Sequence, residues 1–236
     1  HEKNMDGILA MMYFMIERAR GKSVLTADTL KELGKDVNYY PGVTEWFDAV
    51  NEYGKSKGVV IEHYIISSGL KKIIEGTEIA KNFCEIFASE FVYDEYGVPY
   101  WPAVALNYTS KIQFLYRINK GIFDVSDDKN LNDSMEERNR RIPFCNMIYI
   151  GDGLTDVPSM KVTRLNGGHS IGVYADEQEN ARKMMKAGRI NFMAKADYTK
   201  DSELMRIVKR IVDMLAAEND LMELSLSQYD KSKENF

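Results

Sequence analysis

The stretch that decides the fold is Ile148-Tyr-Ile-Gly-Asp-Gly-Leu-Thr-Asp156, an apolar run that ends in two glycines and two carboxylates. The apolar residues up to 150 predict a strand, and Asp152 and Asp156 follow at its carboxyl end. Two carboxylates at this spacing, beside glycines that allow close backbone approach, suit Mg²⁺, which takes hard oxygen ligands and keeps several waters. We therefore predict a magnesium site held by Asp152 and Asp156; the alternative is an ordinary Asp-Gly turn.

Strands and helices alternate on both sides of this stretch. Residues 59–66 form a near-continuous apolar run, which is typical of a parallel strand covered on both faces. Further strands are predicted over 170–174 and 190–193, helices over 43–53, 109–121 and 204–215, and an inserted β-hairpin over 91–101. The alternation predicts an α/β fold with a doubly wound parallel sheet, in which ligands bind beyond the carboxyl ends of the strands.

The first forty residues predict a small helical segment. Residues 5–20 form an apolar helix, and a second short helix follows, with Thr29 and Glu32 at the spacing of a capping box. Two such helices cannot bury a core of their own, so they are expected to pack on the rest of the chain as a cap. Pro41-Gly42 marks the break, which gives a cap segment over 1–40 and a core over 41–236.

Two further loops carry residues suited to an anion. Ser67-Ser68-Gly69 follows the predicted 59–66 strand, where a hydroxyl and the backbone N–H groups of a helix start can bind phosphate; the alternative is an N-cap serine. Lys111 lies in the first turn of a predicted helix, where a cation opposes the helix dipole. That conflict indicates a lysine that neutralises a phosphate, and the alternative is a solvated surface lysine.

Composition excludes several classes of protein. The 236 residues carry a formal net charge of −5 and no dense Lys/Arg run, so no nucleic-acid partner is expected. The longest apolar run, 8–16, is far shorter than the roughly 20 residues that span a bilayer, so no membrane partner is expected either. Cys84 and Cys145 lack a metal-binding spacing and indicate buried thiols in a reducing, cytoplasmic compartment. The sequence does not indicate an oligomeric state.

Taken in order, the three loops resemble the motifs of the haloacid dehalogenase superfamily of phosphatases. Ser67 resembles the second motif, Lys111 the lysine of the third, and residues 148–156 the fourth, which is the most specific of them. The resemblance covers essentially the whole chain and implies a Rossmannoid core. The helices before Pro41 look like the small cap of the phosphoserine-phosphatase-like branch.

The chain departs from this family at its first motif, DxDx[TV], which supplies the nucleophile and the general acid/base. Asp6-Gly7 follows no predicted strand, and the acidic segment 124–128 lies after Lys111 in a polar loop. We expect the motif to lie upstream of this chain, natural loss being the other explanation. Without the strand that carries it, its neighbours are expected to be left unpaired.

The resemblance implies a Mg²⁺-dependent phosphatase that acts on a small phosphorylated substrate through an aspartyl-phosphate in the full-length parent. Asp152 and Asp156 would hold the metal, while Ser67, Ser68, Gly69 and Lys111 would bind the phosphate, Ser67 and Lys111 with catalytic roles. This chain alone is expected to be inactive. The alternative function is a catalytically inactive phosphate- or metal-binding protein on the same fold. An unrelated nucleotide binder is disfavoured, because neither GxGxxG nor GxxxxGK[ST] is present.

Overall fold

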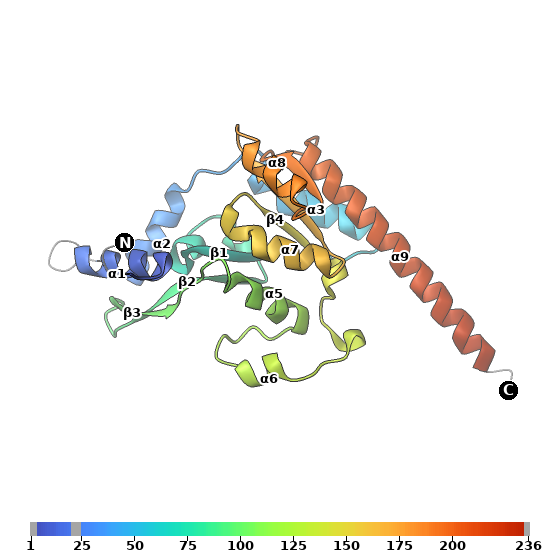
Figure 1. Cartoon of the computed structure of the whole chain (residues 1–236), viewed down its shortest axis with the longest axis horizontal. Coiled ribbons are helices and arrows are strands. Elements are labelled where there is room, and N and C mark those ends of the chain that lie inside the picture. Colours follow the sequence, from blue (N-terminus) through green and yellow to red (C-terminus); the bar gives the residue numbers. More distant parts are fainter. Residues whose placement is uncertain (1–3, 20–24, 234–236) are drawn as a thin grey trace. The chain divides into compact units, whose positions relative to one another are not determined.

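The structure, a computed structural model, describes residues 4–19 and 25–233. It divides into two compact units, one made of the chain up to Tyr39 and Glu62–Met193, the other of Tyr40–Ile61 and the chain from Ala194 onward. Figure 1 labels the helices and strands along the chain. Helices and strands alternate, so the predicted α/β class is confirmed. The predicted division into a cap (1–40) and a core (41–236) stays a prediction. The two compact units are each made of two separate stretches of the sequence, with boundaries after Tyr39, Ile61 and Met193.

The first unit contains a sheet in the order β1 (Tyr64–Leu70), β2 (Glu85–Tyr93), β3 (Pro99–Val104). β1 and β2 are parallel, and β2 and β3 form the predicted antiparallel hairpin. The Asp94 carboxylate accepts hydrogen bonds from the backbone N–H groups of Tyr96 and Val98, and Gly97 takes a positive φ of 75°. This turn chemistry explains why the chain reverses here.

A second sheet has the order β4 (Ile148–Gly151), β5 (His169–Tyr174), β6 (Phe192–Lys195), with β4 and β5 parallel. The expectation of one doubly wound parallel sheet is therefore wrong for the residues that the structure describes, which form two three-stranded sheets. Each sheet ends in a strand with a single partner, β1 in one and β4 in the other. No described strand pairs with the open sides of β1 and β4, which is why the sheets remain separate.

One helix joins the cores of the two sheets. α5 (Lys111–Lys120) buries Phe114, Leu115 and Ile118 in a cluster with Phe87 of β2 and Met147. Side chains of both edge strands, Tyr64 and Ile66 of β1 and Tyr149 of β4, pack against the same cluster. The two edges therefore share one hydrophobic core although they belong to different sheets.

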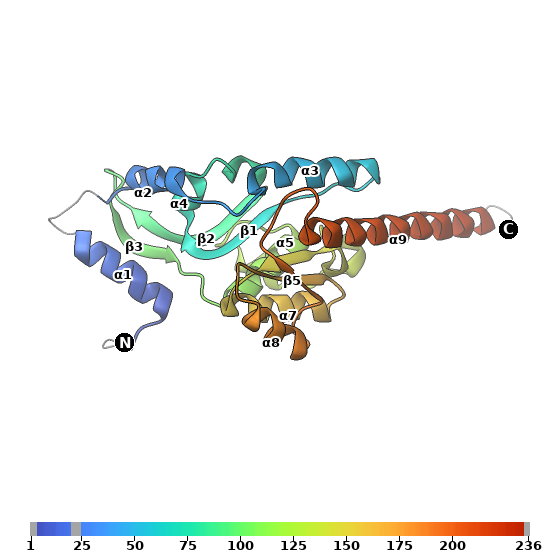
Figure 2. The same cartoon turned by 90° about the horizontal axis from the view of Figure 1, so that it is seen from above.

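α7 (Val157–Leu165) and α8 (Glu179–Lys186) both pack on β5 (Figure 2). Val157, Met160, Met184 and Ile190 form their buried cluster. Gln178 precedes α8 at the N-cap position and makes no side-chain capping bond. The second sheet thus gains a helical layer from the residues directly after β4 and β5.

The N-terminal helices are α1 (Gly7–Ala19) and α2 (Ala27–Leu33), and α4 (Lys71–Glu75) follows β1. Met12 and Leu30 are buried with Leu70 and Phe91. The expected capping pair Thr29/Glu32 is wrong, because Thr26 is the N-cap and shares a capping box with Thr29. α2 contacts α4 closely: a Cβ on Gly76 would lie 1.8 Å from the Lys31 carbonyl oxygen, so only glycine fits there (Figure 2).

A buried arginine fixes the polar loop after α5. Arg117, 1 % exposed, donates to the carbonyl oxygens of Asp124 and Val125 and pairs with Asp128 at 3.1 Å. α6 (Asp128–Asn132) begins in this loop. The remaining short elements are 3-10 turns at Gly34–Asp36, Ala80–Asn82, Glu137–Asn139, Phe144–Asn146 and Leu154–Asp156.

The second unit pairs α3 (Val43–Ser56) with α9 (Glu203–Lys233). α9 runs as one continuous helix (Figure 2). It buries the predicted apolar stripe from Leu204 to Leu215, and its side chains from Ala217 to Lys233 are exposed. Gly42 precedes α3 with a φ of 78°, and a Cβ there would lie 2.5 Å from the Thr199 nitrogen. In the ranges 4–19 and 25–233, no helix has both the length and the hydropathy needed to cross a membrane.

Candidate phosphate and metal site

The site begins at the first residue of α5. The Asn107 side chain accepts hydrogen bonds from the backbone N–H groups of Thr109 (3.1 Å) and Ser110 (2.9 Å), which fixes the turn that leads into the helix. Lys111 follows, 5 % exposed, and its Nζ lies 2.7 Å from Asp156 Oδ1. Lys111 is therefore a buried, paired cation, and the alternative of a solvated surface lysine does not hold.

Asp156 is held by three donors. Its Oδ1 also accepts from the Tyr149 hydroxyl at 2.8 Å, and its Oδ2 accepts from the Gly153 N–H at 3.2 Å. A Cβ on Gly151 would lie 2.8 Å from Asp156 Cγ, so the glycine at the end of β4 is what admits the carboxylate. These contacts fix the position of the carboxylate beside Lys111.

Tyr149 was not predicted from the sequence. Burial raises the pKa of its hydroxyl, and the neighbouring Asp156 charge raises that pKa further, so the hydroxyl stays protonated and donates. One signal was available: side chains alternate along a strand, so residues 149 and 151 share a face, and the missing side chain at Gly151 leaves room for a partner of Tyr149.

Asp152, the other predicted metal ligand, is exposed. In the described part of the chain its carboxylate makes no hydrogen bond or ion pair, so it is free to bind a cation. The same residues contain no group of three or more His, Cys, Asp or Glu side chains arranged for a metal. Mg²⁺ is often bound by one or two carboxylates together with substrate phosphate oxygens. One free carboxylate, Asp152, is available for that mode, and Asp156 is already engaged by Lys111; the magnesium site stays a prediction.

The segment 67–69 lies inside a strand rather than in a turn. β1 starts at Tyr64 instead of at residue 59 and runs through Ser67 to Leu70, because that is where it pairs with β2; the predicted strand over 59–66 is shifted accordingly. The register breaks between Ser67 and Leu70, and Ser67 Oγ accepts from the Gly69 N–H at 3.0 Å. Ser68 Oγ is buried without a hydrogen-bond partner in the structure. Two adjacent strand residues face opposite sides, so at most one of these hydroxyls faces a given ligand.

The structure brings together only some of the predicted site residues. Lys111 and Asp156 are in contact, and α5 also contacts β1. Within 4–19 and 25–233, no hydrogen bond or ion pair joins residues 67–69 or Asp152 to that pair. The roles assigned to Ser67, Ser68, Gly69 and Asp152 stay predictions.

Other aspartates that resemble a first motif have structural uses. Asp6 Oδ1 accepts from the N–H groups of Ile8 (3.0 Å) and Leu9 (3.2 Å) at the start of α1. Asp124 and Asp127 hold the loop after α5, through Ser126 and Asn130 respectively, and these hydrogen bonds lower the pKa of each carboxyl. Asp6 Oδ2 also accepts from the Asn107 side chain at 3.2 Å, and within the described residues none of the three forms a hydrogen bond or ion pair with Lys111 or Asp156.

A comparison with curated proteins finds a similar sequence. The chain is 29 % identical over 196 residues to an uncharacterized protein of Borreliella burgdorferi (strain ATCC 35210 / DSM 4680 / CIP 102532 / B31), and the match covers 74 % of this chain and 67 % of that protein. No family model matches the chain.

Proposed function

We propose that the residues around Lys111 and Asp156 bind the phosphate group of a small phosphate monoester together with Mg²⁺, as part of a phosphohydrolase of the haloacid dehalogenase type. The observation that carries the proposal is the buried 2.7 Å contact between Lys111 Nζ and Asp156 Oδ1, directly after the carboxyl end of β4. Ligands of α/β proteins bind beyond the carboxyl ends of strands, and a lysine at the start of a helix has no helical reason to be there.

Each residue has a distinct part in this site. Asp156 fixes the position of the Lys111 ammonium, which then offsets phosphate charge without reorganising as the ligand arrives. Asp152 provides the free carboxylate for Mg²⁺, whose contribution when bound is to neutralise charge on the phosphoryl oxygens. Ser67 donates its hydroxyl to a phosphoryl oxygen, which is the role that its position near the end of β1 supports.

The covalent route needs a nucleophile that the described residues do not offer. Asp156 accepts hydrogen bonds from three groups and faces Lys111, so attack by its carboxylate would break the buried pair. An aspartyl-phosphate therefore requires a carboxylate other than Asp156. The second candidate, a phosphate- and metal-binding protein without turnover, is favoured by this same engagement of Asp156.

The test is hydrolysis of a generic aryl phosphate by the full-length gene product, with Mg²⁺ and with EDTA. We expect Mg²⁺-dependent turnover that falls by at least about a hundredfold in Asp152→Asn, because the exposed side chain can change without disturbing the fold. Asp48→Asn, which also removes an exposed carboxylate, is the matched control and retains turnover.

Two outcomes would contradict the phosphatase proposal. Turnover that persists in EDTA would remove the role of the metal, and turnover unchanged in Asp152→Asn would remove the role of Asp152. Magnesium-dependent phosphate binding without any hydrolysis would instead support the second candidate.

A further inference from the structure

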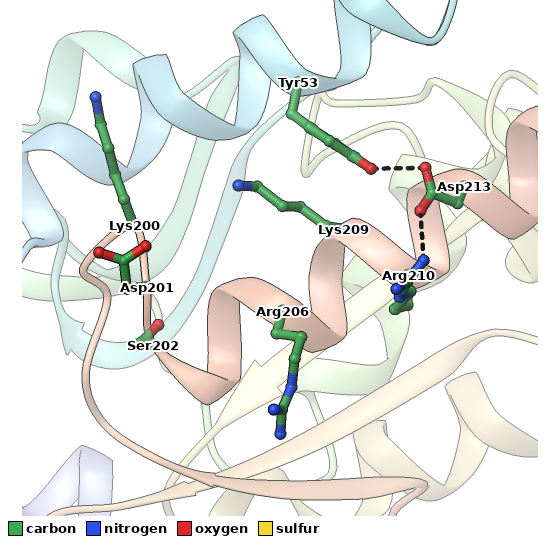
Figure 3. Close-up of a pocket in the computed structure, with 8 residues that line it drawn as sticks. All are labelled: Tyr53, Lys200, Asp201, Ser202, Arg206, Lys209, Arg210 and Asp213. Carbon is green, nitrogen blue, oxygen red and sulfur yellow. Dashed lines mark hydrogen bonds and ion pairs between the residues drawn. The ribbon is translucent and has the colours of Figure 1, made fainter.

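The second unit contains a pocket that lies outside the site described above. It has a volume of about 350 Å³, and its lining residues come from α3, from the segment before α9 and from the first turns of α9 (Figure 3). That volume is at the lower end of those found for small-molecule sites. The pocket therefore suits a small ligand rather than a large cofactor.

The lining is cationic in a chain that is acidic. The lining contains four cationic side chains and two carboxylates: Lys200, Arg206, Lys209 and Arg210, with Asp201 and Asp213. This is an excess of two positive charges, although the whole chain has a net charge of −5. A local excess of one sign in a concave surface attracts ligands of the other sign.

Asp213, one of the two carboxylates, already has hydrogen-bond and ion-pair partners. Its Oδ1 accepts from the Tyr53 hydroxyl at 2.6 Å and lies 3.0 Å from Lys57 Nζ, while its Oδ2 lies 3.5 Å from Arg210 (Figure 3). The Tyr53 hydrogen bond, followed by Lys57, lowers the pKa of Asp213, so this carboxyl stays ionised while it contacts Tyr53, Lys57 and Arg210.

Two lysines of the pocket remain without an acidic partner. In the described part of the chain, neither Lys200 nor Lys209 has a carboxylate within ion-pair distance, and Lys209 instead lies 5.2 Å from the centre of the Tyr53 ring. Lys200 lies three residues before the first residue of α9, whose start is capped by Ser202: the Ser202 Oγ accepts from the Met205 N–H at 3.1 Å. The positive end of α9 thus adds to the field of the two lysines.

We infer that this pocket binds a small phosphorylated or polyphosphate anion through Lys200 and Lys209. Arg206, which pairs with Glu203 at 3.3 Å on an exposed surface, is available to exchange that weak contact for the anion. The pocket is a second anion site, distinct in residues and in compact unit from the one around Lys111.

The experiment is a titration of the 236-residue chain with pyrophosphate, followed by amide chemical shifts, which report the position of binding. We expect saturable shifts concentrated in residues 199–213. In Lys200→Ala/Lys209→Ala the dissociation constant read from these amides rises at least about tenfold. Lys81→Ala/Lys186→Ala, which removes the same charge from exposed positions elsewhere, keeps the original dissociation constant.

Two results would overturn the inference: a rise below about threefold in the pocket variant, or an equal rise in the control variant, which would show attraction by net charge alone. Because the shifts are read at residues 199–213, pyrophosphate that binds only near Lys111 leaves these amides unmoved and also overturns it.

Discussion

Each compact unit contains an aspartate that accepts from a tyrosine and lies against a lysine, yet the two clusters differ in exposure. In the first unit the Lys111 and Asp156 side chains are 6 % and 10 % exposed; in the second, those of Lys57 and Asp213 are 40 % and 27 % exposed. The distances are similar, 2.7 Å and 3.0 Å. The same three residue types, Tyr, Asp and Lys, therefore form a buried cluster in the first unit and a solvated cluster in the second.

The causes of the raised tyrosine pKa values show the effect of this difference in exposure. Burial is the largest cause of the raised pKa of Tyr149, whereas the hydrogen bond to Asp213 is the largest cause for Tyr53. In the buried cluster, removing one member leaves a charge that water cannot reach, so the fold depends on all members together. In the exposed cluster water replaces a lost partner, so the members remain free to exchange partners with a ligand.

Breaking the buried pair gives the largest expected effect. Asp156→Ala leaves Lys111 buried without a counter-charge, and the free energy of unfolding should fall by about 4 kcal/mol in urea denaturation followed by circular dichroism. The matched variant is Asp213→Ala in the exposed cluster, for which a far smaller change is expected. Equal losses in the two variants would contradict the comparison.

A histidine gives a test of burial through the pH dependence of stability. Burial lowers the pKa of His63, which directly precedes β1, to about 4 from an ordinary value of 6.5. The unfolded chain therefore binds the proton more readily between these values, so the stability that His63 contributes is complete above about pH 6.5 and is lost as the pH falls toward 4.

After a discount for partial exposure, the loss attributable to His63 should reach about 2 kcal/mol at the acidic end. His63→Phe should remove this part of the pH dependence, measured as the difference between the two unfolding profiles. Parallel profiles for the two proteins would show that His63 does not contribute.

The smallest expected effect comes from the two tyrosine hydroxyls. Tyr149→Phe removes a donor to a buried carboxylate and should cost about 1–2 kcal/mol of unfolding free energy. Tyr53→Phe removes the corresponding donor in the exposed cluster and should cost less, with a loss that shrinks at high salt. A larger loss for Tyr53→Phe than for Tyr149→Phe would reverse the assignment of the buried and exposed clusters.

Local chemistry made parts of this molecule predictable. The motif at 148–156 combines a short apolar strand, glycines and acids, and its glycine at 151 is required by the close Asp156 carboxylate. The hairpin turn at Asp94–Gly97 was likewise predictable, because the aspartate side chain and a glycine with positive φ specify it. Features that are determined by interactions among a few neighbouring residues can be predicted from the sequence.

Features that depend on distant partners could not be predicted. The strand β1 begins at Tyr64 rather than at 59 because Glu85 of β2 pairs there, and Val60, inside the predicted strand, is 87 % exposed. Tyr149 was missed for a different reason: its partner Asp156 is near in sequence, but the turn after β4 sets the position of that carboxylate. The pocket beside Tyr53 joins α3 to α9, which lie far apart in the sequence.

The most direct test of the central claim is to locate the bound metal ion by its effect on the amide signals. Mn²⁺, which shares the oxygen-ligand preference of Mg²⁺, broadens the amide signals of nearby residues. The account predicts broadening centred on residues 151–156 that strengthens when inorganic phosphate is added, is lost in Asp152→Asn and persists in Asp48→Asn. Broadening centred elsewhere, or unchanged in Asp152→Asn, would contradict a phosphate and metal site beside the buried Lys111–Asp156 pair.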